Sequence, residues 1–432
     1  MAGTVTPERV SIDAAHRFPN GVVEMDGHLR WDLDELQRQI QQGLDRIPAA
    51  EAIGIDAWGV DYGLLDETGA LLAQPIAYRD ERTLKLIDDV HRLITPAEMF
   101  ATNGLQFLPF NTIYQLAAEQ LGPWWVRTAH LALIPDLIAY RLTGILRTEI
   151  TNASTTGLLD ARTQEWSDEL LTRLAIPVHV LPRLQSPGEL RGTTATGTPV
   201  TTVGSHDTAS AVVAVPATGK AFAYIACGTW SLLGVELASP VLTEAARAAN
   251  FTNELGVDGR TLFLRNVGGL WLLQECLRTW GREDLGALLH AAALLPNGPR
   301  IEVDDPELIP PGGMPARIAS AAGRAALTPA EIVRCILSSL ADAYARTLHQ
   351  ANMLSGTNVD VVHIVGGGSL NDLLCQLTAE ATGLPVVAGP VEATAIGNIL
   401  VQARAHGAAP ASLEELRALV ARSVRLRVFE PS

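Results

Sequence analysis

The sequence predicts an α/β protein built from two domains. Its 432 residues exceed what a single hydrophobic core usually serves, and 47% of them are apolar, which is enough to fill two cores. Strand-like and helix-like segments alternate, with a strand, a glycine-rich turn, a helix and another strand expected over residues 359–387. A break at residues 216–220 separates two such runs, so we expect domains over residues 1–215 and 216–432.

The first helix is expected directly after residue 32. Asp32 is followed three positions later by Glu35, which is the pattern of a capping box, and leucine or isoleucine then recurs at helical spacing over residues 33–44. A strand is expected next, at residues 52–55. The chain therefore begins with mixed helices and strands.

A hairpin and then a helical region are expected downstream. Residues 60–65 have a strand pattern closed by the turn 66–69, and residues 71–76 should pair back across it. Residues 96–142 have a helical pattern, and Gly144 follows in the position where helices usually end.

The second half repeats the alternation. Strands are expected at 200–203, 222–226 and 359–365. Thr328 and Glu331 form a second capping box, with a proline between them, and should begin a long helix.

Charge and composition exclude several classes of protein. The formal net charge of −15 disfavours nucleic acid or an anionic membrane as a partner. No apolar run reaches the ~18 residues that a membrane-spanning helix needs, and no signal peptide is apparent, so we expect a cytoplasmic protein. The cysteines lie in apolar contexts without metal-ligand spacing, which predicts reduced thiols in the core; they are Cys227, Cys276, Cys335 and Cys375.

The most informative segment is Ser-His-Asp-Thr at residues 205–208. Asp207 lies where a strand pattern gives way to a helix pattern, and the positive end of a helix dipole favours an ionised carboxylate there. Asp207 is therefore a candidate proton acceptor. The alternative is that this polar segment simply caps the helix, because Asp, Ser and Thr are all good caps.

Glycine-rich turns follow two other expected strands. Residues 228–231 read Gly-Thr-Trp-Ser, and residues 366–368 are three consecutive glycines. Glycines at strand ends let the backbone approach a phosphate, although a plain strand-to-helix turn uses them as well.

These motifs belong to a longer ordered set. The set occupies residues 55–61, 78–83, 106–112, 206–208, 228–231, 266–274, 366–371 and 389–398. It resembles the FGGY family of carbohydrate kinases over nearly the whole chain. The resemblance implies two ribonuclease-H-like domains of the actin and hexokinase superfamily, with the active site in the cleft between them. The N-terminal domain would bind the sugar and the C-terminal domain the nucleotide.

The resemblance also implies roles for single residues. Asp207 matches the general base, which takes the proton of the sugar hydroxyl. The residues that match sugar contacts are Gly59, His206, Asp207, Thr208 and Asn266. The residues that match nucleotide contacts are Thr229, Gln274 and Gly367. For Gly59 the alternative is a purely conformational role in a turn, and for His206 it is a packing role with backbone partners.

The chain departs from the family at its N-terminus. Family members open with a phosphate-binding hairpin of the pattern Asp-x-Gly-x-x-Ser-x-Arg, and no such pattern precedes residues 16–18. We expect Met1 to correspond to an internal methionine of the relatives and residues 4–15 to be the second half of that hairpin. The resemblance implies ATP and Mg²⁺ as cofactors, but the residues leave the metal ligands unknown.

The implied activity is the ATP-dependent phosphorylation of a ketose, with L-rhamnulose and its 1-phosphate as the expected pair, in L-rhamnose catabolism. Two alternatives remain open. One is a kinase for another ketose such as L-fuculose. The other is a sugar-binding protein that has lost transfer activity with its phosphate-binding hairpin. The expected partners are the sugar and ATP, with a monomer or homodimer as the assembly.

Overall fold

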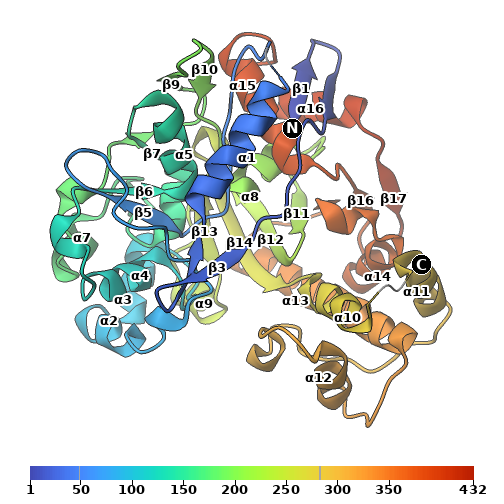
Figure 1. Cartoon of the computed structure of the whole chain (residues 1–432). Helices are drawn as coiled ribbons and strands as arrows, with labels where there is room; N and C mark the ends of the chain where they lie inside the picture. Colours follow the sequence, from blue (N-terminus) through green and yellow to red (C-terminus); the bar gives the residue numbers. More distant parts are fainter. Residues whose placement is uncertain (48, 282–283) are drawn as a thin grey trace. The chain divides into compact units, whose positions relative to one another are not determined.

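The computed structural model describes residues 1–47, 49–281 and 284–432. The chain packs into two compact units, coloured along the sequence in Figure 1. Unit 1 comprises Met1–Ala214, Leu237–Leu262 and Thr394–Ser423, and unit 2 comprises Val215–Glu236, Phe263–Ala393 and Val424–Ser432. The chain first passes from one unit to the other beside the predicted boundary and then exchanges segments several more times. A single boundary does not describe these exchanges, and the division into domains 1–215 and 216–432 stays a prediction.

Unit 1 contains short strands that pair in twos. The antiparallel pairs are β1 (Ala2–Val5) with β2 (Val10–Asp13), β3 (Val22–Met25) with β4 (His28–Trp31), β5 (Tyr62–Leu65) with β6 (His130–Leu133), and β9 (Leu190–Thr193) with β10 (Pro199–Thr201). The parallel pair is β7 (Thr148–Glu149) with β8 (Leu184–Gln185), and β13 (Thr252–Leu255) also belongs to this unit.

Helices surround these strands. They are α1 (Leu33–Asp45), α2 (Ile87–Leu93), α3 (Pro96–Asn103), α4 (Thr112–Glu119), α5 (Ile134–Thr143), α6 (Ile150–Ala153), α7 (Asp168–Arg173), α8 (Asp207–Val213), α9 (Glu244–Ala248), α15 (Ala393–Ala405) and α16 (Leu413–Ser423). As predicted, Asp32 caps α1 by accepting from the Glu35 N–H, and α5 ends at Gly144, whose φ is 72°. Buried side chains of α1, β5, β6 and α5 form one core, which includes Leu33, Leu65, Ala132 and Leu137.

Three expectations for this unit were wrong. β5 pairs with β6 rather than with residues 71–76, which meet β5 in a bridge between Leu71 and Leu65. The region 96–142, expected to be helical, therefore contains a strand. Residues 52–55 form a single bridge, from Ile53 to Val200, instead of a full strand. Residues 4–15 were expected to form one arm of a hairpin, but β1 and β2 are both arms of a hairpin closed by hydrogen bonds between Thr6 and Arg9.

Unit 2 is built on a mixed sheet with the strand order β14-β12-β11-β15-β16-β17. Its strands, lying wholly or mainly in this unit, are β11 (Phe222–Cys227), β12 (Trp230–Leu237), β14 (Thr261–Gly268), β15 (Val361–Val365), β16 (Val386–Ala388) and β17 (Arg427–Phe429). β11 and β15 pair in parallel and are almost continuously buried, as expected for central strands.

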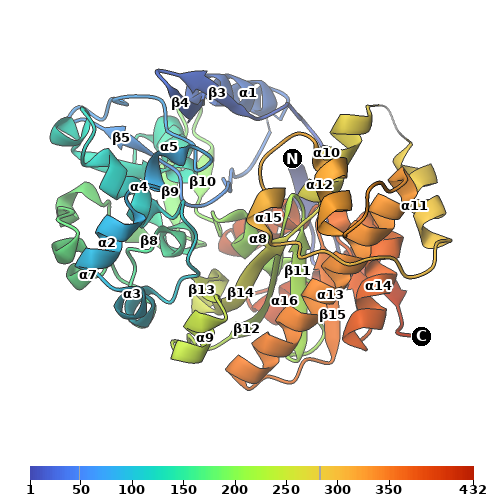
Figure 2. The ribbon, with the colours of Figure 1, turned by 90° about the horizontal axis from the view of Figure 1, so that it is seen from below.

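The helices of unit 2 are α10 (Trp271–Trp280), α11 (Leu285–Ala293), α12 (Met314–Ala321), α13 (Pro329–Ser355) and α14 (Asp372–Thr382). The predicted capping box of Thr328 and Glu331 begins α13, with both reciprocal hydrogen bonds present. Figure 2 shows α13 beside α14, and these two helices pack closely.

The alternation of helices and strands confirms the α/β class. All four cysteines are buried and free of disulfides, as predicted. None of the helices in the described part of the chain combines the length and the apolar character needed to cross a membrane.

Candidate active site

Asp207 is the first residue of α8. His206 occupies the capping position, and its side chain makes no capping hydrogen bond. The Asp207 side chain is 48% exposed and accepts a hydrogen bond from Thr208 Oγ1 at 3.3 Å. The alternative that Asp207 is the helix cap is therefore wrong. Its carboxylate is left half-exposed in the first turn of the helix.

Two loops of unit 1 are joined beside this carboxylate. The Ala57 N–H donates to the Ser205 carbonyl at 2.9 Å, and the Asp207 N–H donates to the Ala57 carbonyl at 3.0 Å. We call residues 57–61 and 205–208 the paired loops. They bring together four predicted site residues, namely Gly59, His206, Asp207 and Thr208.

The backbone of the first paired loop is strained. Val60 has a φ of 67°, which is rare for a β-branched residue, and the Asp61 N–H donates to the Gly59 carbonyl at 2.9 Å to close a three-residue turn. Thr155 Oγ1 accepts from the Val60 N–H at 3.1 Å, and Thr112 Oγ1 donates to the Val60 carbonyl at 2.7 Å. Such strain persists only where the surroundings impose it, and it clusters at functional sites.

Gly59 has a structural reason to be glycine. A Cβ at this position would lie 2.7 Å from Thr155 Oγ1, so a side chain would push the two segments apart. The turn also explains why β5 begins at Tyr62 instead of residue 60, because Val60 leaves the extended conformation.

Two carboxylates near Gly59 have different environments. Asp61 is fully buried, and burial raises its pKa while four hydrogen bonds oppose that effect. Asp56 accepts a hydrogen bond from Asn398, and burial raises its pKa to about 6. Asp61 is thus a structural residue whose acceptor capacity is used inside the fold. Its donors are Trp31 Nε1 at 2.6 Å, Trp58 Nε1 at 3.0 Å, Gln115 Nε2 at 3.1 Å and the Tyr78 N–H at 3.1 Å.

His206 lies between two carboxylates. Its Nδ1 is 3.2 Å from Glu254 Oε2 in β13, and its Nε2 is 3.5 Å from Asp207 Oδ1. Burial alone would lower the pKa of His206, but these carboxylates, Glu254 most of all, raise it to about 9. The ring is therefore cationic at neutral pH and its partners are carboxylates, so the alternative of a packing histidine with backbone partners is wrong. Sequence reasoning missed Glu254, whose only signal was an acidic residue in a buried strand.

Unit 2 holds the other predicted residues. Thr229 follows β11, and its Oγ1 is 3.5 Å from Oε1 of Gln274 on α10. The turn before β12 is fixed by the N–H of Leu270, which donates to the Gly228 carbonyl at 3.0 Å, and by that of Trp271, which donates to the Thr229 carbonyl at 3.1 Å. This arrangement presents a hydroxyl and an amide at one turn. Asn266 lies in β14.

The three glycines after β15 differ in what they need. Gly366 has a φ of 81°, and a Cβ on Gly368 would overlap the Cys227 side chain. A Cβ on Gly367 would meet nothing within 4 Å. Two of the glycines are thus required by the turn and by packing on β11, while the space beside Gly367 is open.

The folds of solved sugar kinases match this chain. A ligand-bound xylulose kinase from Lactobacillus acidophilus superposes with a TM-score of 0.80 at 19% identity, over 96% of this chain and 88% of that one. A glycerol kinase from Plasmodium falciparum, solved with ADP, gives a TM-score of 0.77 at 17% identity, with the same coverage. The fold is therefore the two-domain sugar kinase fold of the actin and hexokinase type, as predicted.

The family follows from the sequence matches. Residues 12–214 match the N-terminal domain of the FGGY family of carbohydrate kinases, and residues 223–406 match its C-terminal domain. The chain belongs to this family. It is 41% identical to rhamnulokinases from two strains of Klebsiella pneumoniae over 442 aligned positions, which cover 99% of this chain and 90% of each relative.

The ion pair of His206 and Glu254 predicts a pH dependence of stability. Because folding raises the pKa of His206 from 6.5 to about 9, the stabilisation is complete below pH 6.5 and is lost as the pH rises through 9. The difference in unfolding free energy between wild type and Glu254→Gln should therefore shrink from pH 6.5 to pH 9.5 in urea titrations. Glu244→Gln, in an exposed pair with Arg247, is the control and should show no such trend. A Glu254→Gln difference that stays constant across this range would contradict the assignment.

Proposed function

We propose that this chain transfers the γ-phosphoryl group of ATP to the terminal hydroxyl of L-rhamnulose, giving L-rhamnulose 1-phosphate and ADP in L-rhamnose catabolism. The observation that carries the proposal is 41% identity to rhamnulokinases along nearly the whole chain. The paired loops support it, because they present a half-exposed carboxylate that the fold does not use as a helix cap.

Asp207 is the proposed general base. The sugar hydroxyl gives its proton to the Asp207 carboxylate as its oxygen attacks the γ-phosphorus, and the bond from that phosphorus to the bridging oxygen of ADP breaks. Thr208 donates to the same carboxylate, which orients it for the incoming hydroxyl. Phosphoryl transfer needs little covalent chemistry from the protein, so alignment and charge stabilisation are the main tasks.

The sugar contacts are proposed for Gly59, His206, Asp207, Thr208 and Asn266. The His206 cation can donate a hydrogen bond to a sugar oxygen, and the Asn266 amide can both donate to and accept from hydroxyls. Gly59 presents backbone without a side chain on a strained turn, which fixes that backbone in one position.

The nucleotide contacts are proposed for Thr229, Gln274 and Gly367. The Thr229 hydroxyl and the Gln274 amide lie at one turn, and Gly367 leaves room for a ligand against its backbone. Magnesium bound to ATP would supply positive charge that offsets the negative charge of the phosphates. Mg²⁺ commonly keeps waters and phosphate oxygens as ligands, so it would need few ligands from the protein.

A panel of acceptors tests the proposed substrate. ADP formation measured by a coupled assay should show the highest kcat/KM for L-rhamnulose and should require Mg²⁺. L-fuculose and D-xylulose are the controls. An equal or higher kcat/KM for either would move the proposal to a kinase for that ketose, and saturable sugar binding without ADP formation would indicate a binding protein.

Replacement of the base tests the mechanism. Asp207→Asn should lower kcat by roughly 10² or more while sugar affinity changes much less, because the amide cannot take the hydroxyl proton. Thr208→Val is the comparison beside it and should retain a far higher kcat, since it removes a donor to the carboxylate and a proposed sugar contact but leaves the base in place. Turnover in Asp207→Asn at the wild-type rate would remove the base assignment.

The neighbouring glycines give a matched pair for the nucleotide contacts. Gly367→Ala should leave stability within roughly 0.5 kcal/mol of wild type but raise the KM for ATP, because the added methyl occupies open space. Gly368→Ala should lower the melting temperature, because its methyl overlaps Cys227. An unchanged KM for ATP in Gly367→Ala would contradict the proposed contact.

A further inference from the structure

Glu149 is a buried carboxylate below the paired loops. It ends β7, caps α6 and has no exposed surface. Its Oε1 accepts from the Thr151 N–H at 2.8 Å, and its Oε2 accepts from the Asn152 N–H at 3.0 Å and from Thr151 Oγ1 at 2.6 Å. These bonds fix the carboxylate to its own segment.

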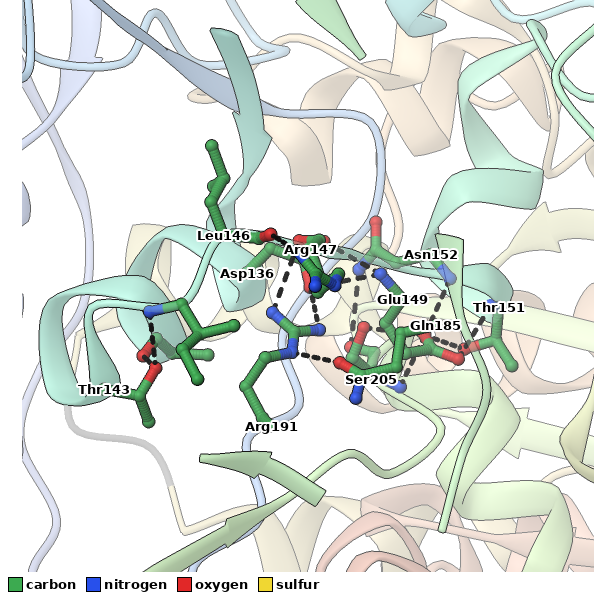
Figure 3. Close-up of polar contacts among 12 residues, drawn as sticks. Asp136, Thr143, Leu146, Arg147, Glu149, Thr151, Asn152, Gln185, Arg191 and Ser205 are labelled. Atoms are coloured by element: carbon green, nitrogen blue, oxygen red, sulfur yellow. Dashed lines mark hydrogen bonds and ion pairs between the residues drawn. The ribbon is translucent and has the colours of Figure 1, made fainter. Parts of the chain in front are cut away.

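The same oxygen also holds the second paired loop. Glu149 Oε2 accepts from the Ser205 N–H at 3.0 Å and from Ser205 Oγ at 2.7 Å, and Figure 3 shows the two side chains facing each other. Ser205 lies two residues before Asp207. Thr151 Oγ1, itself bound to Glu149, accepts from the His206 N–H at 3.3 Å. Glu149 thus controls the backbone that leads directly into the proposed base.

The segment that Glu149 caps supports the first paired loop as well. Asn152 Nδ2 donates to the carbonyls of Trp58 and Ser205, both at 3.4 Å. Thr155 Oγ1 donates to the Asn152 carbonyl at 2.8 Å and accepts from the Val60 N–H. One short segment, residues 149–155, therefore positions both loops.

A buried ion pair of Asp136 and Arg191 lies next to Glu149. Its N–H donates to Asp136 Oδ1 at 3.1 Å, and Asp136 pairs with Arg191 at 2.8 Å, with both of these side chains at most 2% exposed (Figure 3). The Arg191 guanidinium also donates to Gln185 and to the Arg147 carbonyl. Only Asp136 pairs with this guanidinium, and the Glu149 carboxylate is stabilised by N–H and O–H donors. A buried carboxylate is costly unless hydrogen-bond donors satisfy it. Two of the donors to Glu149 belong to Ser205, so the bonds that satisfy the carboxylate also fix the second paired loop.

We infer that Glu149 is a positioning residue, which holds residues 205–207 so that the Asp207 carboxylate meets the sugar hydroxyl. The inference rests on the proposed role of Asp207 as base. A misplacement of about 1 Å can lower a rate by ~10²-fold, so loosening this loop should act on kcat more than on sugar binding.

Glu149→Gln is the main test. Whichever way the amide turns, its NH₂ group faces at least one of the N–H donors, and the charge that strengthens the remaining bonds is gone. We expect kcat to fall by roughly 10-fold or more and the KM for L-rhamnulose to change by less than about threefold. Hydrogen exchange at residues 205–207 should become faster, and this readout does not need activity.

Asp136→Asn is the matched control. It breaks a buried ion pair in the same network but touches no residue of the paired loops, so it should lower stability while keeping kcat within about threefold of wild type. An equal loss of kcat in Asp136→Asn would assign the effect to the network as a whole and overturn the inference. Wild-type kcat together with wild-type exchange in Glu149→Gln would also overturn it.

Ser205→Ala decides the case if Glu149→Gln does not fold. It removes one of the five bonds to Glu149 from the loop side and leaves the buried charge with four. Reduced kcat at unchanged KM in a folded Ser205→Ala supports the inference, and wild-type kcat overturns it. If the wild-type chain phosphorylates no ketose, the proposed function fails, whereas the exchange measurement still reports whether Glu149 holds the loop.

Discussion

Two hydrogen bonds, which join Ala57 to residues 205 and 207, set the geometry of the paired loops. They join loops that are about 150 positions apart in the chain. Bringing such distant segments together costs chain entropy, so the contact exists only because larger elements already hold both ends. Gly59 reaches the neighbourhood of Asp207 through this pairing. The strained conformation of Val60 is a consequence of it, since the chain must turn sharply between the pairing and β5.

Unit 1 supports these loops with buried carboxylates, and burying a carboxylate costs free energy. Asp61, Asp136 and Glu149 are each at most 1% exposed, and each is surrounded by donors. Only Asp136 pairs directly with a cation, Arg191, whereas Asp61 and Glu149 depend on indole, amide, hydroxyl and backbone donors. Burial raises the pKa of Glu149, and its hydrogen bonds oppose that rise. A satisfied polar network defines one arrangement, because any shift leaves a buried donor or acceptor unpaired. Apolar contacts are not directional, so they allow two packed segments to shift past each other and do not select one arrangement.

The features that were predicted correctly from the sequence are the ones that depend on neighbouring residues. The caps of α1 and α13, the stop of α5 at Gly144 and the start of α8 near Asp207 all depend on residues within a few positions of one another. The pairing of β5 with β6 depends on a partner more than 60 residues later, and residues 71–76 offered a nearer but incorrect one. The positive φ of Val60 had no signal, because a valine is a typical strand residue.

The same distinction applies to the site. Asp207 was found from a motif of adjacent residues, while Glu254 and Glu149 were missed because their importance lies in partners far along the chain. Both glutamates have polar neighbours in the sequence, such as Thr148 and Asn253, so no apolar pattern marks either of them as buried. The sequence alone also gives no donor for either carboxylate.

The three glycines at 366–368 are glycine for different physical reasons. In the sequence, the three residues form a single motif that is typical of a phosphate-binding turn. In the structure, Gly366 is needed for a left-handed backbone and Gly368 for close packing on Cys227, so neither points to a ligand. Gly367 has neither requirement, because a Cβ at this position would meet nothing within 4 Å. The fold itself does not require glycine at position 367, so a bound ligand can explain why glycine is there. Gly367 is therefore the one residue of this turn that points to a nucleotide contact.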